Sequence, residues 1–297
     1  MQFIAFIVIY PFLWCISILP FRMLYALSDG VYVLLYHVIG YRKKTVWQNL
    51  KLVFPEKSDT ELRAISKRFY RHLSDLFMEM IKTLSISKKQ LAKRFVVTNP
   101  EELKRLEAKN KSIILMYGHY ASYEWSINVE RYTTYKGVGI YKTLANRYFD
   151  KLVRKIRSKY NTELVDTKKA IAELVSYEEN NIRILSAFLS DQSPRLNKAY
   201  YWTRFMNINV PCFTGAEMLA KKLDHTVAYL QITKVKRGHY EAEIVTLAED
   251  PREYKDYDIT EKFTRTLEAQ IYKAPAYYLW THKRWKHKDK TPSPLTK

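Results

Sequence analysis

The first 21 residues of the chain carry no charged side chain, and this run constrains the fold more than any other feature. A helix needs about 20 mostly apolar residues to cross the hydrocarbon core of a bilayer. A cleaved signal peptide would need a basic segment before the apolar run and a small-residue cleavage site after it, and the sequence shows neither. Residues 1–21 therefore predict a membrane-anchoring helix, with a buried core helix as the alternative.

A second apolar stretch, residues 23–41, contains one acidic side chain, Asp29, and is followed directly by Arg-Lys-Lys at residues 42–44. The stretch either lies in the membrane interface or returns across the bilayer as the second leg of a hairpin. Because Lys and Arg beside a membrane segment stay on the cytoplasmic side, residues 42–44 predict that the large C-terminal part faces the cytoplasm. The sequence thus divides into an anchor, a globular domain and a basic tail, at residues 1–41, 42–285 and 286–297.

The chain is strongly basic, with 50 Lys and Arg against 30 Asp and Glu and a net charge of +20. Residues 1–41 contain one basic and one acidic residue, so the excess lies entirely in the remainder. Such a charge favours an anionic membrane surface, an acidic carrier protein or nucleic acid as a partner. Nucleic acid is disfavoured, because an anchor would hold the chain at the bilayer and the sequence contains no nucleic-acid-binding motif.

The globular domain alternates helix-like and strand-like segments. Apolar residues three and four apart predict an amphipathic helix over residues 60–84, and the run KSIILMY at 111–117 predicts a buried strand. We expect further helices at residues 121–132, 146–160, 168–178, 215–223 and 259–272, and further strands at 137–141, 182–189, 226–233 and 240–246. The last two strands form a predicted hairpin. The alternation predicts an α/β fold with a mixed, mostly parallel central sheet flanked by helices.

The motif that carries chemistry follows the strand at 111–117, where His119 and Glu124 are five residues apart. Ligands bind at the carboxyl ends of strands in open α/β folds. With His119 on the turn and Glu124 in the first helical turn, the carboxylate can accept the Nδ1–H of the imidazole and raise its basicity. The spacing predicts His119 as a general base oriented by Glu124, with a structural turn as the alternative.

Together with several other segments, this motif resembles the lipid A biosynthesis acyltransferase family, the late lauroyl- and myristoyl-type enzymes of the lysophospholipid acyltransferase superfamily. The matching segments are Arg42-x6-Asn49-Leu50-x3-Phe54-Pro55-Glu56, Tyr141-x4-Asn146 leading to Arg157, Asp191-Gln192-Ser193-Pro194, Phe213-Thr214-Gly215 and Leu279-Trp280-x-His282-Lys283-Arg284-Trp285. Ser193-Pro194 departs from the Asp-Tyr of enterobacterial members, so the chain looks more like a member from Bacteroidota-type bacteria.

The resemblance implies a glycerolipid acyltransferase-like fold and an O-acyltransferase. Such an enzyme moves a fatty acyl chain from acyl carrier protein to a hydroxyl of an anionic glycolipid acceptor, a lipid A precursor, on the cytoplasmic side of the inner membrane. A hydroxyl is a poor nucleophile, so a base such as His119 must take its proton as the C–O bond forms.

Five further residues are candidates for substrate binding. Arg157 either stabilises developing negative charge or forms a surface ion pair. Asp191 and its neighbour Gln192 follow a predicted strand, where the carboxylate orients a basic side chain or the acceptor sugar, or forms a turn. Thr214 and Gly215 begin a predicted helix, whose amides either hold a phosphate or an oxyanion or are simply capped.

Neither a cofactor nor a metal ion is expected. The sequence contains no His pair at helical spacing beside a Glu, no G-x-S-x-G, no P-loop and no G-x-G-x-x-G, and its two cysteines cannot form a thiolate zinc site. Four alternatives to a lipid A acyltransferase stay open. They are a lysophospholipid acyltransferase, an aminolipid acyltransferase, a lipid hydrolase or thioesterase that uses the same dyad with water, and a non-catalytic membrane-tethered binding protein.

Overall fold

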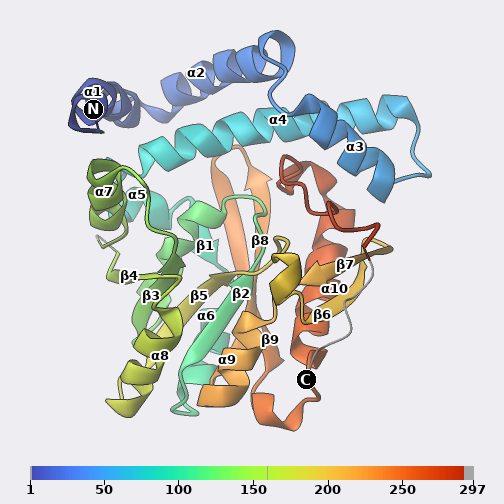
Figure 1. Ribbon diagram of the computed structural model, residues 1–297. Coiled ribbons are helices and arrows are strands. Elements are labelled where there is room, and N and C mark those ends of the chain that lie inside the picture. The colour runs from blue at the N-terminus through green and yellow to red at the C-terminus, as the bar shows by residue number, and fades with distance from the viewer. Residues whose placement is uncertain (1, 159, 291–297) are drawn as a thin grey trace.

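A seven-stranded mixed sheet runs through the centre of the molecule (Figure 1). The computed structural model describes residues 2–158 and 160–290. The strands of the sheet are β1 (Phe95–Val97), β2 (Ile113–Tyr117), β3 (Lys136–Tyr141), β4 (Thr162–Asp166), β5 (Ile184–Leu189), β8 (Thr226–Lys236) and β9 (His239–Ala248). Their order is β1-β9-β8-β2-β5-β3-β4, and the five strands from β8 to β4 are parallel to one another. The predicted mixed, mostly parallel sheet is confirmed.

The central strand β2 lies between β5 and β8, and all five of its residues are buried. A parallel strand that is covered on both faces is a continuous apolar run, which explains why the sequence IILMY shows no alternation. The predicted hairpin is formed by β8 and β9, which pair antiparallel. A separate two-stranded sheet of β6 (Tyr201–Phe205) and β7 (Ile208–Cys212) was not predicted, nor were β1 and β4.

Helices surround the sheet (Figure 1). They are α3 (Lys43–Val53), α4 (Asp59–Lys82), α5 (Lys88–Ala92), α6 (Pro100–Glu107), α7 (Arg147–Ser158), α8 (Ala170–Glu179), α9 (Gly215–Leu223) and α10 (Asp258–Lys273). The long helix α4 begins with a capping box between Ser58 and Glu61 and confirms the helix predicted from periodicity. The segment predicted as a helix at 121–132 is a 3₁₀-helix, η2 (Tyr123–Tyr132). Shorter turns of 3₁₀-helix are η3 (Leu196–Lys198), η4 (Pro251–Glu253) and η5 (Pro275–Tyr277).

The uncharged N-terminal run forms an apolar helix, but that helix is shorter than the predicted residues 1–21. The first helix, α1 (Gln2–Ile18), ends before Pro20, and α2 (Phe21–Val33) continues into a π-helical turn, η1 (Leu34–Val38). Pro20 has extended backbone angles as the N-cap residue of α2, whereas Pro11 lies inside α1 without breaking it. Within the part of the chain that the structure describes, no single helix has the length and hydropathy to cross a membrane. The segments Phe21–Val38 and Lys43–Val53 pass that test only together, bent by 84°.

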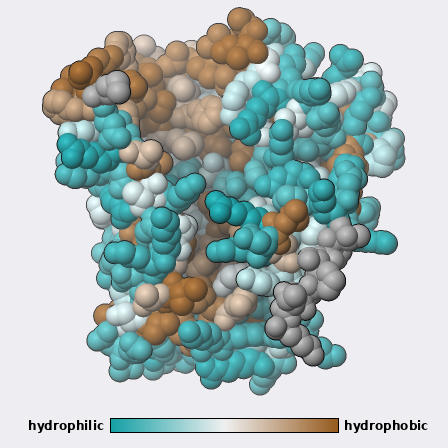
Figure 2. All heavy atoms as spheres, viewed as in Figure 1, coloured by the Kyte–Doolittle hydropathy of each residue, from teal (hydrophilic) through white to brown (hydrophobic). Residues whose placement is uncertain are grey.

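The helices α1 and α2 lie over α4, at the top of Figure 1, and expose an apolar surface there, seen as the brown region in Figure 2. The exposed apolar side chains of this surface are Phe3, Ile4, Ile7, Val8, Ile9, Phe12, Trp14, Ile18, Met23, Leu27, Val33, Leu34, Val38 and Ile39. We call this set the apolar cap. An exposed apolar area of this kind marks a site of contact with a membrane or another protein.

The apolar cap is tied to the rest of the molecule by polar and aromatic contacts. Lys82 at the end of α4 donates hydrogen bonds to the carbonyl oxygens of Ser17 and Leu19, at 2.6 and 2.8 Å. The Phe6 ring of α1 packs against Phe149 of α7, with 5.2 Å between the ring centroids. Just before α7, the Ala145 carbonyl oxygen accepts a hydrogen bond from the Gln2 side-chain amide, and the Asn146 side-chain amide donates to the Gln2 carbonyl oxygen. The basic tail predicted for residues 286–297 lies outside the described residues from 291 onward.

Buried charges also fasten α2 to α4 and to the β8–β9 turn. Asp75 of α4 accepts hydrogen bonds from Ser28 at 2.8 Å and from Arg237 at 2.7 Å, and its other oxygen lies 3.3 Å from the Lys234 ammonium. The side chain of Asp75 is 4% exposed. The largely buried Lys234 side chain therefore depends on this carboxylate, whereas Arg237 is also paired with Asp29 at 2.7 Å.

We predict that Asp75→Ala lowers the free energy of unfolding by about 3 kcal/mol, because it leaves a buried cation without its counter-charge. Asp59→Ala is the matched control, since the Asp59–Lys51 ion pair is exposed and should contribute at most about 1 kcal/mol. Urea unfolding followed by tryptophan fluorescence measures both. Equal losses in the two variants would contradict a structural role for the buried cluster.

Candidate active site

His119 stands at the carboxyl edge of the sheet, next to Asp191. The strands β2 and β5 are parallel neighbours, and their ladder ends with Tyr117 opposite Leu189. His119 and Asp191 each follow two residues later, so the chain leaves both strands at the same place. His119 Nδ1 lies 2.7 Å from Asp191 Oδ1, and the two side chains are 15% and 2% exposed. The carboxylate accepts the Nδ1–H, which leaves Nε2 as the unprotonated nitrogen of a neutral ring.

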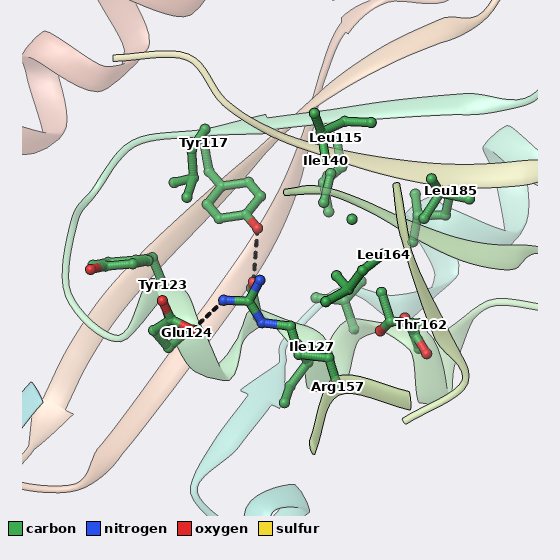
Figure 3. Close-up of a pocket in the computed structure, with 17 residues that line it drawn as sticks. Leu115, Tyr117, Tyr123, Glu124, Ile127, Ile140, Arg157, Thr162, Leu164 and Leu185 are labelled. Atoms are coloured by element: carbon green, nitrogen blue, oxygen red, sulfur yellow. Dashed lines mark hydrogen bonds and ion pairs between the residues drawn. The ribbon is translucent and has the colours of Figure 1, made fainter. Parts of the chain in front are cut away.

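Glu124 does not make the predicted hydrogen bond to His119. Its Oε2 accepts a hydrogen bond from Arg157 Nη2 at 3.0 Å, as Figure 3 shows. The physical reason is local: Ala121 has φ +49°, so the chain turns sharply between His119 and the start of η2. Glu124 then faces α7, and the partner that orients the imidazole is Asp191. Asp191 thus orients a basic side chain, as one of its expected roles allowed, and Glu124 pairs with Arg157 instead of His119.

Charge and burial act on the imidazole in opposite directions. Burial alone would lower the pKa of His119, but the charge of Asp191 and its hydrogen bond outweigh burial and raise the pKa above 6.5. The charge of Glu124 adds a smaller contribution in the same direction. The pKa of Asp191 is lowered, because His119 offsets the effect of burying the carboxyl group. The site therefore favours a basic imidazole beside an ionised carboxylate.

Gln192 and Tyr123 complete the surroundings of the imidazole. The amide nitrogen of Gln192 lies 3.3 Å from His119 Nε2 and donates to it in the tautomer set by Asp191. The Tyr123 ring meets the imidazole edge to face, with 4.9 Å between the ring centroids. A nucleophile that gives its proton to Nε2 must take the place of the Gln192 amide.

The remaining predicted site residues divide into two groups. Arg157 is joined to the site through Glu124, and Gln192 contacts the reactive nitrogen directly. Thr214 and Gly215 begin α9 as predicted, but the Thr214 hydroxyl donates to Met218 Sδ at 3.5 Å. Over the described residues, no hydrogen bond joins either of them to His119. Nor do these residues contain a group of three or more His, Cys, Asp or Glu that could hold a metal ion.

A C-terminal segment of the chain supports the site, and sequence reasoning assigned it no role. The Leu279 amide donates to the His119 carbonyl oxygen at 3.1 Å. The buried Asn49 amide in turn donates to the carbonyl oxygens of Trp280 and His282, at 2.8 and 2.9 Å. The sequence contained a signal, since Asn49 and Trp280 both stand in segments quoted for the family resemblance. Their contact, across more than 200 residues, was not visible in it.

Arg284 of the same C-terminal segment holds the turn after Asp191. Its side chain is 2% exposed and donates to the Pro211 carbonyl oxygen at 2.9 Å. The Ser193 hydroxyl donates to the Arg284 carbonyl oxygen at 2.6 Å. The segment thus fixes both strand-end turns, the one that carries His119 and the one that carries Asp191.

An apolar pocket of about 90 Å³ extends from the Glu124–Arg157 pair along one face of the sheet (Figure 3). Its floor is a row of residues that pair in register on four parallel strands, Leu115, Ala187, Gly139 and Leu164. Residues in register on parallel strands point to the same face. The two central members of the row are the smallest, so the floor is a trough between two leucines. The 3₁₀-helix η2 covers it.

Comparison with known proteins places these residues in a family context. The sequence profile of the family described as bacterial lipid A biosynthesis acyltransferase matches residues 1–287. The chain is 23% identical over 276 residues to the lipid A biosynthesis lauroyltransferase of Escherichia coli K12, covering 92% of this chain and 89% of that protein. It is 22% identical over 289 residues to the lipid A biosynthesis palmitoleoyltransferase of the same strain and to the lipid A biosynthesis acyltransferase of Shigella flexneri. Each alignment covers 92% of this chain and 88% of the relative.

The geometry predicts how the pKa of His119 responds to substitution. In Asp191→Asn the pKa should fall below 6.5, because burial persists while the main opposing charge is removed. Glu124→Gln should lower it by less, because Glu124 acts without a hydrogen bond to the ring. NMR titration of selectively labelled histidine measures both variants. A larger fall in Glu124→Gln than in Asp191→Asn would restore Glu124 as the orienting partner.

Proposed function

The chain belongs to the bacterial lipid A biosynthesis acyltransferase family, and on this premise we propose that it transfers a fatty acyl chain from acyl carrier protein to a hydroxyl group of an anionic lipid A precursor. The observation that carries the proposal is the imidazole of His119. Its Nδ1 is held by a buried carboxylate, and its Nε2 stands at the carboxyl edge of the sheet, one aromatic ring away from an apolar pocket. This is the arrangement that a general base needs beside an apolar substrate.

The proposed reaction begins when the acceptor hydroxyl displaces the Gln192 amide from His119 Nε2. Nε2 takes the proton as the hydroxyl oxygen attacks the thioester carbonyl carbon, and Asp191 stabilises the resulting imidazolium. The tetrahedral intermediate then collapses, the C–S bond breaks, and the imidazolium returns the proton to the leaving thiolate. The displaced Gln192 amide is a hydrogen-bond donor for the oxyanion that forms between these steps.

Glu124 and Arg157 support this reaction as a pair. The Glu124 carboxylate holds the guanidinium at the mouth of the pocket and adds negative charge near the imidazole. We assign Arg157 to the acyl thioester or to an anionic group of the acceptor, because a guanidinium recognises carbonyl and phosphate oxygens well. Thr214 and Gly215, whose amides begin α9, are proposed ligands for a phosphate of the acceptor.

The apolar pocket is the proposed site of the acyl chain. Its lining is mainly leucine, isoleucine, valine and tyrosine side chains, which suit a hydrocarbon chain. The Glu124–Arg157 pair marks its polar end, close to His119 through Tyr123. A chain that enters there leaves its thioester at the carboxyl edge of the sheet.

The apolar cap is the proposed membrane contact. The two short helices α1 and α2 then lie on the cytoplasmic leaflet of the inner membrane, with their exposed apolar side chains among the lipids. Lys43 and Lys44, directly after this region, are exposed and favour an anionic lipid surface. In this position the enzyme reaches a lipid acceptor without crossing the bilayer, and its positive charge favours an acidic carrier protein.

Mass spectrometry of total lipids tests the function directly. Cells with and without the gene should differ by the mass of one acyl chain in one lipid class, and that class names the acceptor. A change in lysophospholipids or aminolipids instead of lipid A would redirect the proposal to that acceptor. With purified protein, acyl carrier thioester consumed without any acceptor would instead indicate a thioesterase.

We predict that His119→Ala lowers the transfer rate by roughly 10²- to 10⁴-fold, because the general base is lost. Asp191→Ala should approach that loss, and the double variant should be little worse than either single one, since the two act as a unit. Transfer of labelled acyl chains from acyl carrier protein, with folding checked by circular dichroism, measures these effects. More than a tenth of wild-type activity in folded His119→Ala would overturn the mechanism.

A second prediction concerns the apolar cap, where Ile4, Val8 and Phe12 form an exposed stripe on α1. Replacing all three by serine should reduce binding to anionic lipid vesicles at least about tenfold, because each apolar side chain contributes roughly 1.5–3 kcal/mol when buried. Ile182→Ser, at an exposed position outside the cap, is the control. Sedimentation with vesicles at high salt measures binding. Unchanged sedimentation of the triple variant would rule out this surface as the membrane contact.

A further inference from the structure

Glu130 closes the far end of the apolar pocket, opposite the Glu124–Arg157 pair. It stands near the end of η2 and lines the pocket together with Thr162 and Leu185. The Thr162 hydroxyl donates a hydrogen bond to Glu130 Oε1. The next row of the sheet floor, Leu185, Gly137 and Thr162, lies directly beneath this carboxyl group.

Gly137 makes room for the Glu130 carboxyl group. A Cβ atom at position 137 would collide with Glu130 Oε1 and crowd Cδ and Cγ of the same side chain. The strand therefore carries glycine at two successive positions of the floor, for two different purposes. Gly139 makes the trough deeper, and Gly137 leaves space for the Glu130 side chain, which closes the trough.

A second, larger cavity lies on the other side of Glu130. Its volume is about 480 Å³, against about 90 Å³ for the apolar pocket, and Ile127 and Glu130 line both. The other walls of this cavity are mostly polar and basic, with Lys88, Lys89 and Arg131 among them. Ile127 and Glu130 are thus the partition between a narrow apolar pocket and a wide basic cavity.

The carboxyl group of Glu130 is energetically unfavourable at this position. Within the described chain, its Oε2 is buried and has no hydrogen-bond partner. Burial raises the pKa of Glu130 to about 7, although Thr162 and Lys88 act in the opposite direction. A buried polar atom without a partner destabilises the fold, so its position is better explained by what it does for the pocket than by stability.

We propose that Glu130 is the end wall of the acyl pocket and limits the length of the acyl chain that the enzyme transfers. The inference rests on the proposed function, in which this pocket holds the chain. One methylene too many in a closed apolar pocket changes a rate by roughly 10- to 200-fold. A chain that reaches Glu130 must stop there or push a carboxyl group toward the basic cavity.

The test is a competition among saturated acyl carrier donors that differ in length by two carbons, with transferred chains identified by mass spectrometry. In Glu130→Ala the partition opens, and the ratio of longer chains to the wild-type preferred chain should rise by roughly tenfold or more. Glu130→Gln keeps the size of the wall and should keep the wild-type profile. Glu179→Ala, an exposed position at the end of α8, is the control for the assay.

Ala187→Leu separates a failure of this inference from a failure of the proposed function. The larger side chain fills the trough between the Glu124–Arg157 pair and Glu130. The variant should therefore transfer shorter chains if the pocket holds the acyl chain at all. A shift in Ala187→Leu with an unchanged profile in Glu130→Ala would overturn the end wall and keep the pocket. Unchanged profiles in both folded variants would overturn the pocket assignment itself. A length profile that changes equally in Glu130→Gln would mean that charge, not size, sets the limit, and would also overturn the inference.

Discussion

The register between β2 and β5 is the constraint on which the site depends. Because Tyr117 faces Leu189 at the end of the ladder, the residues two positions farther along each strand emerge together. The backbone hydrogen bonds of two central strands therefore place the imidazole against its carboxylate, and no loop has to close to form the contact. The same ladder aligns Ala187 with Leu115 and so begins the trough of the pocket. One pairing of strands thus sets both the position of the imidazole and the apolar pocket near it.

Much of the fold could be predicted because its longest elements have strong local patterns. The helices α4, α9 and α10 lie close to their expected bounds, and the β8–β9 hairpin was anticipated. The short strands β1 and β4 were missed, since β1 has only three residues and β4 mixes polar with apolar side chains, and such segments become strands only through neighbours distant in sequence. At the N-terminus the local pattern predicted too long an element. The composition suits one helix over residues 1–21, but the helix ends before Pro20.

The sequence named several residues that the structure brings together, but it did not predict their contacts. Spacing identified His119 and Glu124, and strand ends identified Asp191 as able to orient a basic side chain. The wrong partner was chosen for the imidazole because the sequence shows residues five apart but not the order of strands in a sheet. Asp191 is 72 residues from His119 in the chain and 2.7 Å from it in space. Glu130 was not identified from the sequence either, because the residues around it do not distinguish it from a solvent-exposed carboxylate on a helix.

The contact between α1 and α7 has a practical consequence. Phe6 of α1 packs on α7, the helix that carries Arg157, and Gln2 is hydrogen-bonded to the chain just before α7. Under the membrane contact that we propose, a helix that lies on lipid is thereby part of the scaffold of the proposed acyl pocket. Detergent that replaces the bilayer changes the surroundings of α1 and, through it, of α7. Turnover measured in micelles consequently reports on the curvature and packing of the amphiphile as well as on the chemistry of the enzyme.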